Sequence, residues 1–240
     1  MAEQPQPNTL VTFYVPCYNE EDNVVPTLQS IEQVVKSLNI TYEILVVDDG
    51  SADQTSARVQ SYKSANPNLP VWLIKNDRNM GLGHNYFVAT NQAQGQYFLY
   101  YPGDNCTPVD TSIRILKKIG QADIVIPYIE NPAVRSVARR VISVTFTAIV
   151  NLLNGQNIRY YNGPVVHKVA NVRRLKVAGA GFAYQAEVIS QLLRESQTYV
   201  QVPYSITVRT AGEVSAFRLS NIFSVAYSLY TIFKMRFKKN

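Results

Sequence analysis

The sequence contains 240 residues, of which 46% are hydrophobic, and this length and composition are typical of a folded domain with a sizeable core. Two cysteines and two histidines leave no disulfide framework and argue against a zinc site built from His and Cys. Residues 1–113 carry 12 acidic and 5 basic side chains, whereas residues 114–240 carry 5 acidic and 18 basic ones, within a net charge of +6. The basic half predicts a phosphate-bearing partner or an anionic membrane, and no nucleic-acid-binding motif accompanies it.

The N-terminal residues 1–10 are polar and rich in proline, and they lack the charged and apolar segments of a signal peptide. We expect a flexible tail there. No stretch has the roughly 20 consecutive apolar residues that a membrane-spanning helix needs. The longest candidates, 141–153 and 219–233, are interrupted by Ser, Thr or Asn. Sparse cysteine fits a reducing compartment, so the expected location is cytoplasmic.

Apolar runs alternate with amphipathic stretches through the first half of the chain. We expect strands over residues 11–16, 42–48, 70–75, 96–101 and 122–128. Helices are expected between them over 22–38, from a cap at Ser51 or Asp53 to about Ala65, and over 85–94 and 109–119. This alternation predicts an α/β fold, with a mostly parallel sheet covered by helices on both faces.

The pattern changes after residue 130. A long helix is expected over 134–153, a strand or turn over 159–168, a helix over 182–196, a strand over 199–208 and a final helix from about Leu219. We interpret residues 11–220 as one domain with two halves, 11–128 and 129–220. Residues 221–240 are expected to form a C-terminal amphipathic helix with a basic tail.

Polar clusters follow three of the expected strands: "VPCYNEE" at 15–21, "VVDDGSAD" at 46–53 and "YYPGDN" at 100–105. Taken singly, each cluster is typical of a turn. Ligands of open parallel sheets bind outside the carboxyl ends of the strands, so three such clusters at one edge favour a binding site.

These segments also resemble a known family. "VPCYNEEDNVVPTLQSI", "YEILVVDDGSADQT", "NMGLGHNYFVATNQAQGQYFLY" and "GDN" are similar, in order, to blocks of the family 2 glycosyltransferases with the GT-A fold. The resemblance covers about residues 11–220 and is greatest to the polyprenyl-phosphate branch, which includes dolichol-phosphate mannose synthase. It implies an inverting hexosyltransferase that moves a sugar from a GDP- or UDP-linked nucleotide sugar to a polyprenyl or dolichyl phosphate.

The resemblance implies a role for each strand end in binding the nucleotide sugar. The first strand end would line the base and ribose pocket, Asp48 would accept hydrogen bonds from the base, and Asp49 would support the turn. Glycines at 81 and 83 would let the backbone approach the nucleotide. The full implied set is Pro16, Tyr18, Glu20, Asp48, Arg78, Gly81, Gly83, Gly103 and Asp104.

The "GDN" segment departs from the family pattern, which ends this strand in Asp-x-Asp. Here the first Asp position holds Pro102 and the second holds Asp104, while Cys106 occupies a position where the family often has Gln. Asp104 is therefore the implied ligand of a divalent cation, Mg²⁺ or Mn²⁺. Such hard cations prefer oxygen, so Cys106 is a poor substitute and phosphate oxygens or water would complete the shell.

The basic half resembles the acceptor side of the same branch through "RSVARRVISVTF" at 135–146 and "VPYSITVRTAGEVSAFRLS" at 202–220. Guanidinium groups bind phosphate bidentately and stay charged, so Arg139, Arg140, Arg209 and Ser215 are implied to bind the acceptor phosphate. Asp104, Arg140 and Arg209 are the implied catalytic residues. For Arg135 and Arg218, phosphate binding and a solvated basic face are equally favoured.

A phosphate acceptor is already ionised at neutral pH and needs no general base, which fits the scarcity of acidic residues here. Two alternatives remain open. One is transfer to a soluble hydroxyl acceptor with Glu187 as the base, and the other is a nucleotide-sugar-binding protein without catalysis.

A lipid acceptor also requires contact with a membrane surface, directly or through an integral-membrane partner. The expected contact is the C-terminal helix, where an apolar face precedes the basic residues Lys234, Arg236, Lys238 and Lys239. Packing of that face against the domain itself is equally favoured. The chain would then act at the cytoplasmic side of the membrane.

Overall fold

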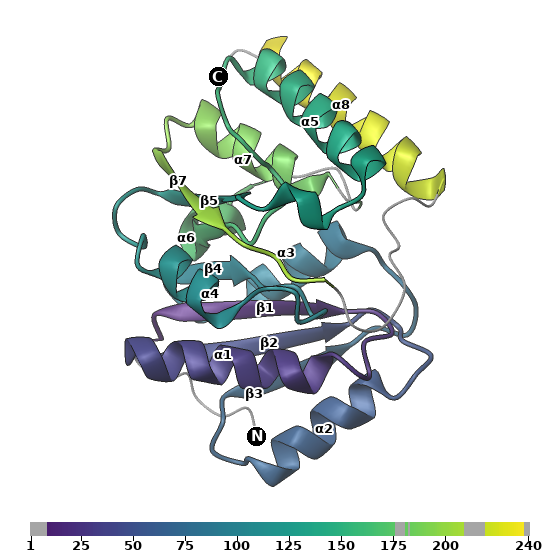
Figure 1. Ribbon diagram of the computed structural model, residues 1–240, viewed down its shortest axis with the longest axis vertical. Coiled ribbons are helices and arrows are strands. Elements are labelled where there is room, and N and C mark those ends of the chain that lie inside the picture. Colours follow the sequence, from purple (N-terminus) through teal and green to yellow (C-terminus); the bar gives the residue numbers. More distant parts are fainter. Residues whose placement is uncertain (1–8, 176–180, 182, 209–218, 238–240) are drawn as a thin grey trace.

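The computed structural model describes residues 9–175, 181, 183–208 and 219–237, which form a sheet flanked by helices (Figure 1). The strand order is β3-β2-β1-β4-β6-β5-β7. The strands are β1 (Val11–Cys17), β2 (Tyr42–Asp48), β3 (Val71–Lys75), β4 (Tyr97–Tyr100), β5 (Ile124–Ile129), β6 (Val166–Lys168) and β7 (Tyr199–Tyr204). The helices are α1 (Val24–Leu38), α2 (Thr55–Ala65), α3 (Leu82–Gln92), α4 (Val109–Leu116), η1 (a 3-10 turn, Pro132–Val134), α5 (Val137–Asn154), α6 (Val169–Arg173), α7 (Tyr184–Arg194) and α8 (Leu219–Phe237).

The sheet is mostly parallel, as the sequence predicts. Among the described strands only β6 runs antiparallel, and it pairs with both β4 and β5, which are therefore parallel to each other. The carboxyl ends of β1, β2, β3, β4, β5 and β7 consequently lie along one edge of the sheet. We call this the carboxyl edge, and all three polar clusters singled out in the sequence lie on it.

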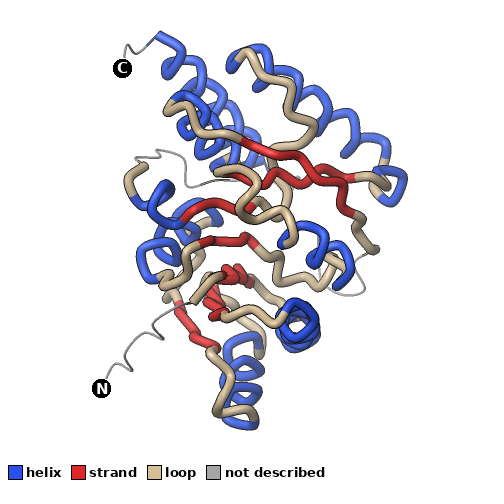
Figure 2. The backbone as a smooth tube through the Cα atoms, turned by 90° about the vertical axis from the view of Figure 1, so that its left-hand side faces the viewer, coloured by secondary structure: helices blue, strands red, loops and turns tan. Residues whose placement is uncertain are grey.

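Helices cover both faces of the sheet, so the core has two layers (Figure 2). Successive side chains of β1 point to opposite faces. Phe13 and Val15 join the layer that contains Leu28 of α1, whereas Tyr14 joins the layer that contains Tyr86 of α3. All five of these core residues are fully or almost fully buried, which fixes how β1 presents its end to the carboxyl edge.

Several element boundaries differ from the expectations. The long helix begins at Val137 rather than residue 134, because residues 132–134 form η1 and the Ser136 hydroxyl accepts a hydrogen bond from Arg139 N. The expected segment 159–168 contains only a short strand, β6, and β7 ends at residue 204. At the start of α2, Asp53 Oδ1 accepts a hydrogen bond from Thr55 N, as expected of a cap. Ser51 instead accepts one from Asn19 N.

The predicted boundaries of the two halves and of the C-terminal helix are an interpretation that the strand order does not test. The sheet runs without interruption from β3 to β7, so the two halves share it. Helix α8 begins at Leu219, two residues before the predicted start of the C-terminal segment.

Helices α5 and α8 lie side by side at one end of the molecule (Figure 1). In α5, Thr147 and Val150 are buried, whereas Val144 and Leu152 are 69% and 75% exposed. By length and composition alone, α5 is the one described helix that could cross a bilayer. The exposed apolar side chains of α5, which we call the α5 apolar face, are Val137, Val141, Ile142, Val144, Ile149 and Leu152.

Candidate active site

The end of β4 is pressed against the end of β1. A Cβ atom at Gly103 would lie 2.6 Å from the Pro16 carbonyl oxygen and 2.7 Å from Cys17 Sγ, closer than any side chain tolerates. The Gly103 carbonyl accepts a hydrogen bond of 3.1 Å from the Thr27 hydroxyl of α1. Glycine is therefore needed here for close backbone approach. This contact brings Gly103 and Asp104 to the Pro16 end of β1, as predicted.

The loop after Gly103 is a tight turn that holds Asp104. Asp104 Oδ1 accepts a hydrogen bond of 3.1 Å from Cys106 N, the arrangement of an Asx-turn. Asn105 adopts a left-handed conformation with φ 53°, and its Oδ1 accepts a bond of 3.0 Å from the Ser30 hydroxyl. The segment is thus a turn, as such clusters usually are, and the turn also fixes a carboxylate at the carboxyl edge.

At the end of β2, two adjacent carboxylates hold two different loops. Asp48 is fully buried; its Oδ1 accepts a bond of 2.9 Å from Ser51 N, and its Oδ2 accepts one from the Ser56 hydroxyl. Asp49 Oδ1 accepts bonds from Met80 N at 2.7 Å and from the Asn76 side chain at 2.9 Å. The other Asp49 oxygen accepts one from Gly81 N at 3.0 Å. Asp49 therefore holds the 76–81 loop at the edge, whereas the turn after β2, which Asp49 was expected to support, is held by Asp48 through Ser51 N.

Glycine is required around this loop for a different reason at each position. Gly50 has φ +73°, and a Cβ there would lie 2.5 Å from the Arg78 carbonyl carbon. Gly81 has φ +90°, which favours glycine, and immediately precedes α3, in which Gly83 is buried. Arg78 is exposed on the same loop. Of the two predicted nucleotide-binding glycines near this loop, Gly81 thus lies beside Asp49, to which its N–H donates a hydrogen bond.

The residues predicted at the end of β1 differ in accessibility. Tyr18 is exposed, whereas Glu20 is buried and its Oε2 accepts a bond of 2.8 Å from the Asn23 side chain. Glu20 N donates to the Thr55 hydroxyl at 2.8 Å, which ties the start of α1 to the start of α2. Glu20 thus has a structural role in these loops, and Tyr18 is free to contact a ligand.

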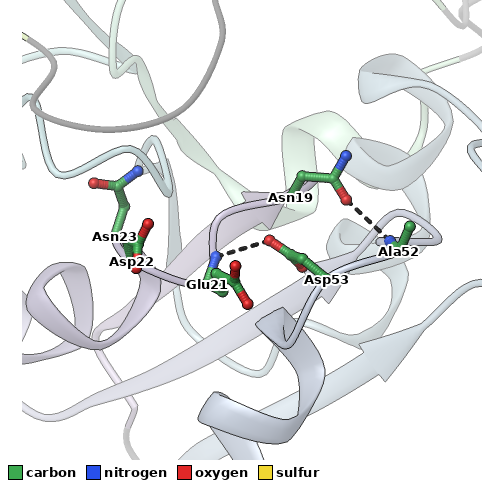
Figure 3. Close-up of a pocket in the computed structure, with 6 residues that line it drawn as sticks. All are labelled: Asn19, Glu21, Asp22, Asn23, Ala52 and Asp53. Atoms are coloured by element: carbon green, nitrogen blue, oxygen red, sulfur yellow. Dashed lines mark hydrogen bonds between the residues drawn. The ribbon is translucent and has the colours of Figure 1, made fainter.

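A pocket of about 420 Å³ opens between the loops that follow β1 and β2 (Figure 3). Its lining is acidic, and Figure 3 shows hydrogen bonds from Ala52 N to Asn19 and from Glu21 N to Asp53. Carboxylates in the lining would repel a diphosphate. None of the predicted nucleotide-binding residues lines it, so we place the candidate site elsewhere along the carboxyl edge, beside Asp104. The lining residues are Asn19, Glu21, Asp22, Asn23, Ala52 and Asp53.

The start of α5 brings arginines toward Asp104. Arg135 Nη1 donates a hydrogen bond of 3.0 Å to the Tyr160 hydroxyl, and its guanidinium carbon lies 5.5 Å from the centre of the Tyr160 ring. Burial, followed by repulsion from Arg135, lowers the pKa of Arg139, while Asp104 acts in the opposite direction. Asp104 is among the weaker influences on the pKa of Arg135 and of Arg139, and it favours the charged form of both.

Other predicted acceptor-side residues are placed less directly. Arg140 is half-buried in the first turn of α5, and none of the described contacts joins it to Asp104. Arg209, Ser215 and Arg218 lie outside the described residues. Glu187, the alternative base, is fully buried in the first turn of α7.

Tyrosines end two of the strands at the carboxyl edge, Tyr100 in β4 and Tyr204 in β7. Burial, with contributions from Tyr184 and Asp104, raises the pKa of Tyr100 well above its ordinary value. Burial and the neighbouring Tyr160 likewise raise the pKa of Tyr204. These hydroxyls stay neutral at physiological pH, so they can donate hydrogen bonds without adding negative charge to a phosphate site.

The sequence reasoning did not identify Tyr160, and it left Arg135 undecided. No local pattern marks either residue, because the two are 25 positions apart in sequence and meet only through the tertiary fold. Gly163, three residues after Tyr160, packs closely on β5: a Cβ there would lie 2.9 Å from the Pro127 carbonyl oxygen and 3.4 Å from the Tyr160 ring.

A divalent cation would find one carboxylate here. Within the described part of the chain, no group of three or more His, Cys, Asp and Glu side chains could hold a metal by itself. Pro102 offers no side-chain ligand, and the Cys106 thiol donates to the Asp104 carbonyl oxygen at 3.5 Å. Mg²⁺ is commonly held by one or two carboxylates together with substrate phosphates, so Asp104 fits a cation shared with a bound diphosphate.

Comparisons with known proteins agree with this geometry. The sequence model of glycosyl transferase family 2 matches residues 12–181. A dolichol-phosphate mannosyltransferase of Pyrococcus furiosus is 27% identical over 234 residues, covering 93% of this chain and 64% of that protein. A dolichyl-phosphate beta-glucosyltransferase of Trichomonas vaginalis is 31% identical over 113 residues, covering 45% of this chain and 33% of that protein. The chain thus spans from about a third to two thirds of the length of these curated relatives.

A solved structure supports the fold. Glucosyl-3-phosphoglycerate synthase from Mycobacterium tuberculosis, in complex with Mn²⁺, uridine diphosphate and phosphoglyceric acid, superposes with a TM-score of 0.68 at 14% identity. The match covers 95% of this chain and 78% of that one. At this identity the likeness concerns the fold alone.

Proposed function

The chain belongs to glycosyl transferase family 2 and has the expected GT-A fold, and from that premise we propose that it transfers a sugar from a nucleotide sugar to a polyprenyl phosphate. The donor would be linked to GDP or UDP. The observation that carries the proposal is a pair of features at the carboxyl edge: the turn after β4 fixes the Asp104 carboxylate, and Arg135, just before α5, is held against Tyr160 with no ion pair among the described residues.

That arrangement suits a reaction between two phosphate-bearing substrates. Asp104 lies at the end of β4 beside Pro16 and would face the diphosphate of the donor. The arginines lie at the start of α5 and would face the phosphate of the acceptor. An ionised phosphate needs charge neutralisation and positioning, which guanidinium groups supply.

In the proposed reaction an oxygen of the acceptor phosphate attacks the anomeric carbon of the sugar. The new carbon–oxygen bond forms as the bond from that carbon to the donor diphosphate breaks, with inversion, and the nucleoside diphosphate leaves with the electron pair. Asp104 would hold a Mg²⁺ or Mn²⁺ ion, which would neutralise charge on the departing diphosphate. The α5 arginines, with Arg209 outside the described residues, would hold the attacking phosphate in line.

Residues at the ends of β1 and β2 would bind the nucleotide. Tyr18 is exposed and available for stacking, and the 76–81 loop, held by Asp49, would let backbone groups reach the nucleotide. Asp48 already accepts two hydrogen bonds from its own chain. Asp48 is also 0% exposed, so the proposed contact with the base would require the loop after β2 to open, after which each carboxylate oxygen could accept a further bond.

The alternative with a hydroxyl acceptor has less support. It needs a general base within reach of the acceptor hydroxyl, and Glu187 is 0% exposed in the first turn of α7. Binding without catalysis is separated from transfer by the assay below.

Contact with a membrane surface completes the proposal. Helix α8 contacts α5 and exposes aromatic side chains of its own, namely Tyr227, Tyr230 and Phe233. Basic residues lie at the start of α5 and, from Lys234 onward, at the end of α8. Apolar and aromatic side chains combined with flanking cations are typical of helices that lie in a lipid interface. We therefore extend the expected membrane contact from α8 to α5.

The test is a transfer assay with the full chain, preceded by a thermal-shift screen of UDP- and GDP-linked sugars. With the stabilising donor and undecaprenyl phosphate in vesicles, we expect a glycosyl phospholipid and the free nucleoside diphosphate in equal amounts, by mass spectrometry. Donor binding without either product would favour the non-catalytic alternative and contradict the proposal.

A further inference from the structure

Tyr100 carries a hydroxyl group that the proposed reaction has not yet used. It is the last residue of β4 and is half-buried at the carboxyl edge. Among the described residues, its hydroxyl has no hydrogen-bond partner. The hydroxyl of Tyr14 instead donates to the Leu82 carbonyl oxygen at 3.3 Å, and that of Tyr101 donates to the Thr107 carbonyl oxygen at 3.4 Å. The fold thus satisfies these two neighbouring tyrosines and leaves the Tyr100 hydroxyl available to a ligand.

The Tyr100 ring is held in place by a layer of aromatic side chains. Its centre lies 6.0 Å from the centre of the Tyr14 ring, and Tyr14 in turn stacks on Phe98 with the ring centres 5.5 Å apart. Tyr14 and Phe98 are both fully buried. Because packing already orders the Tyr100 ring, little side-chain entropy is lost when its hydroxyl binds a ligand.

Tyr100 joins the two parts of the candidate site. On one side, the turn that follows β4 fixes Asp104. On the other side, Tyr100 N donates a hydrogen bond of 3.3 Å to the backbone just after Gly163 and Pro164. A Cβ atom at Gly163 would lie 3.4 Å from the ring of Tyr160, which accepts the hydrogen bond from the first of the arginines. Tyr100 therefore lies where the donor side of the site meets its acceptor side.

The groups around Tyr100 indicate which part of a ligand it meets. Burial and Tyr184, followed by Asp104 and Tyr160, raise the pKa of Tyr100 well above its ordinary value, so its hydroxyl stays neutral. Phosphates are bound most strongly by charged donors, whereas a neutral hydroxyl, which both donates and accepts, matches the hydroxyls of a sugar. In the proposed reaction, the sugar lies between the donor diphosphate and the acceptor phosphate. The sugar is therefore the part of the ligand expected at Tyr100.

We propose that the Tyr100 hydroxyl forms a hydrogen bond with a hydroxyl group of the donor sugar and so contributes to the choice of sugar. The contact rests on the proposed function and deepens it, since it concerns the donor of that reaction. A site that hydrogen-bonds a substrate hydroxyl discriminates against analogues that lack it, because its own polar group is then left unpaired. The Tyr204 hydroxyl likewise has no partner among the described residues, but Tyr204 is 3% exposed, which favours Tyr100 as the contact.

The experiment measures binding to the full chain by calorimetry, with no acceptor present. The probes are the UDP- or GDP-linked sugar selected by the thermal-shift screen and the matching UDP or GDP, which lacks the sugar. Tyr100→Phe should weaken binding of the nucleotide sugar by about 3-fold to 10-fold, the loss of one neutral hydrogen bond. Binding of the free nucleoside diphosphate should be unchanged, whereas a variant with a loosened fold would bind both probes more weakly.

Tyr97→Phe is the matched control. Tyr97 is the first residue of the same strand, is also half-buried and lies toward the opposite edge of the sheet, so its replacement should leave both affinities unchanged. Deoxy analogues of the donor, each lacking one sugar hydroxyl, then identify the contact. One analogue should bind the wild type about 3-fold to 10-fold more weakly than the parent donor, but should bind Tyr100→Phe as well as the parent donor does.

Each result decides the proposal. Equal losses for the nucleotide sugar and the nucleoside diphosphate, no loss for either, or additive losses for every deoxy analogue would overturn the sugar contact. If Tyr100→Phe binds the donor normally while the wild type transfers sugar to lipid phosphate, the contact is wrong and the proposed function stands. If Tyr100→Phe binds the donor more weakly but the wild type transfers no sugar to lipid phosphate, the contact stands and the proposed function fails. If no UDP- or GDP-linked sugar binds the wild type, both fail.

Discussion

The two sides of the carboxyl edge use charge in opposite ways. On the side formed by β1 and β2, the carboxylates of Asp48 and Asp49 accept hydrogen bonds from backbone amides and side chains of neighbouring loops. On the side formed by α5, Arg135 and Arg139 have no ion pair within the described residues. On the acidic side, the carboxylates are therefore used in hydrogen bonds that hold loops. On the basic side, the guanidinium groups are available to bind a ligand. Asp104, between them, makes one bond that shapes its own turn.

Replacement of Asp104 should give the largest effect on activity. Asp104→Ala should lower the rate of transfer by about 10²- to 10³-fold, because charge on the departing diphosphate loses its stabilisation. Asp104→Asn keeps the acceptor for Cys106 N and should be equally inactive. Both variants should unfold near the wild-type temperature. Activity retained by Asp104→Asn would show that the carboxylate serves only the turn.

Asp49 provides the matched test on the acidic side. Asp49→Ala leaves two backbone amides and the Asn76 side chain without their acceptor, and should reduce the free energy of unfolding by about 3 kcal/mol. Urea titration measures this loss, and Asp77→Ala, at an exposed position of the same loop, is the control. A loss below about 1 kcal/mol would mean that Asp49 is not what holds the 76–81 loop.

Strand β6, which lies between β4 and β5 in the sheet, should make the stability of the protein sensitive to acid. His167 of β6 pairs with Phe98 of β4 and Ile124 of β5, and burial lowers its pKa to about 3. The unfolded chain, with a His pKa near 6.5, therefore binds this proton first as the pH falls. Stability should decline from about pH 6.5 toward pH 3, by up to about 1.4 kcal/mol per unit.

His167→Phe should remove this part of the acid sensitivity, whereas His84→Gln, at an exposed position of α3, should keep it. Denaturation midpoints between pH 4 and pH 7 supply the comparison. Equal slopes in the two variants would mean that His167 is protonated in the folded protein.

A further test of the basic side concerns the proposed contact of α5 with a membrane surface. Val144→Glu with Leu152→Glu places two acidic side chains on the α5 apolar face and should reduce flotation with anionic vesicles at low salt. Gln29→Glu with Gln33→Glu makes the same charge change at exposed positions of α1 and is the control. A chain ending at Phe233 tests the basic tail separately. Flotation that is unaffected by the α5 changes would remove α5 from the contact.

The smallest effect concerns the departure from Asp-x-Asp. Pro102→Asp should be tolerated because residue 102 lies in a loop, and it should lower the Mg²⁺ or Mn²⁺ concentration needed for half-maximal activity by a few-fold. An unchanged metal titration would indicate that position 102 does not face the cation.

Much of this arrangement could be predicted from local patterns. The strand ends at Cys17, Asp48 and Tyr100 followed from apolar runs that stop at turn residues, and parallel pairing placed them on one edge. A strand or turn was expected over 159–168, but the short length and antiparallel direction of β6 could not be predicted, because three residues give no usable periodicity. The contact between Arg135 and Tyr160 depends on how loops after β5 and before β6 meet, and no local rule specifies that.

The central claim is that the acceptor is a phosphate, and one comparison tests it directly. With the same donor and the same vesicles, the rate of transfer to undecaprenyl phosphate is measured against that to undecaprenol, which has the identical chain and a hydroxyl in place of the phosphate. The account predicts transfer to the phosphate and at least about 10³-fold less to the alcohol, since the chain offers the alcohol no accessible base at Glu187. Comparable rates with the two acceptors would contradict it.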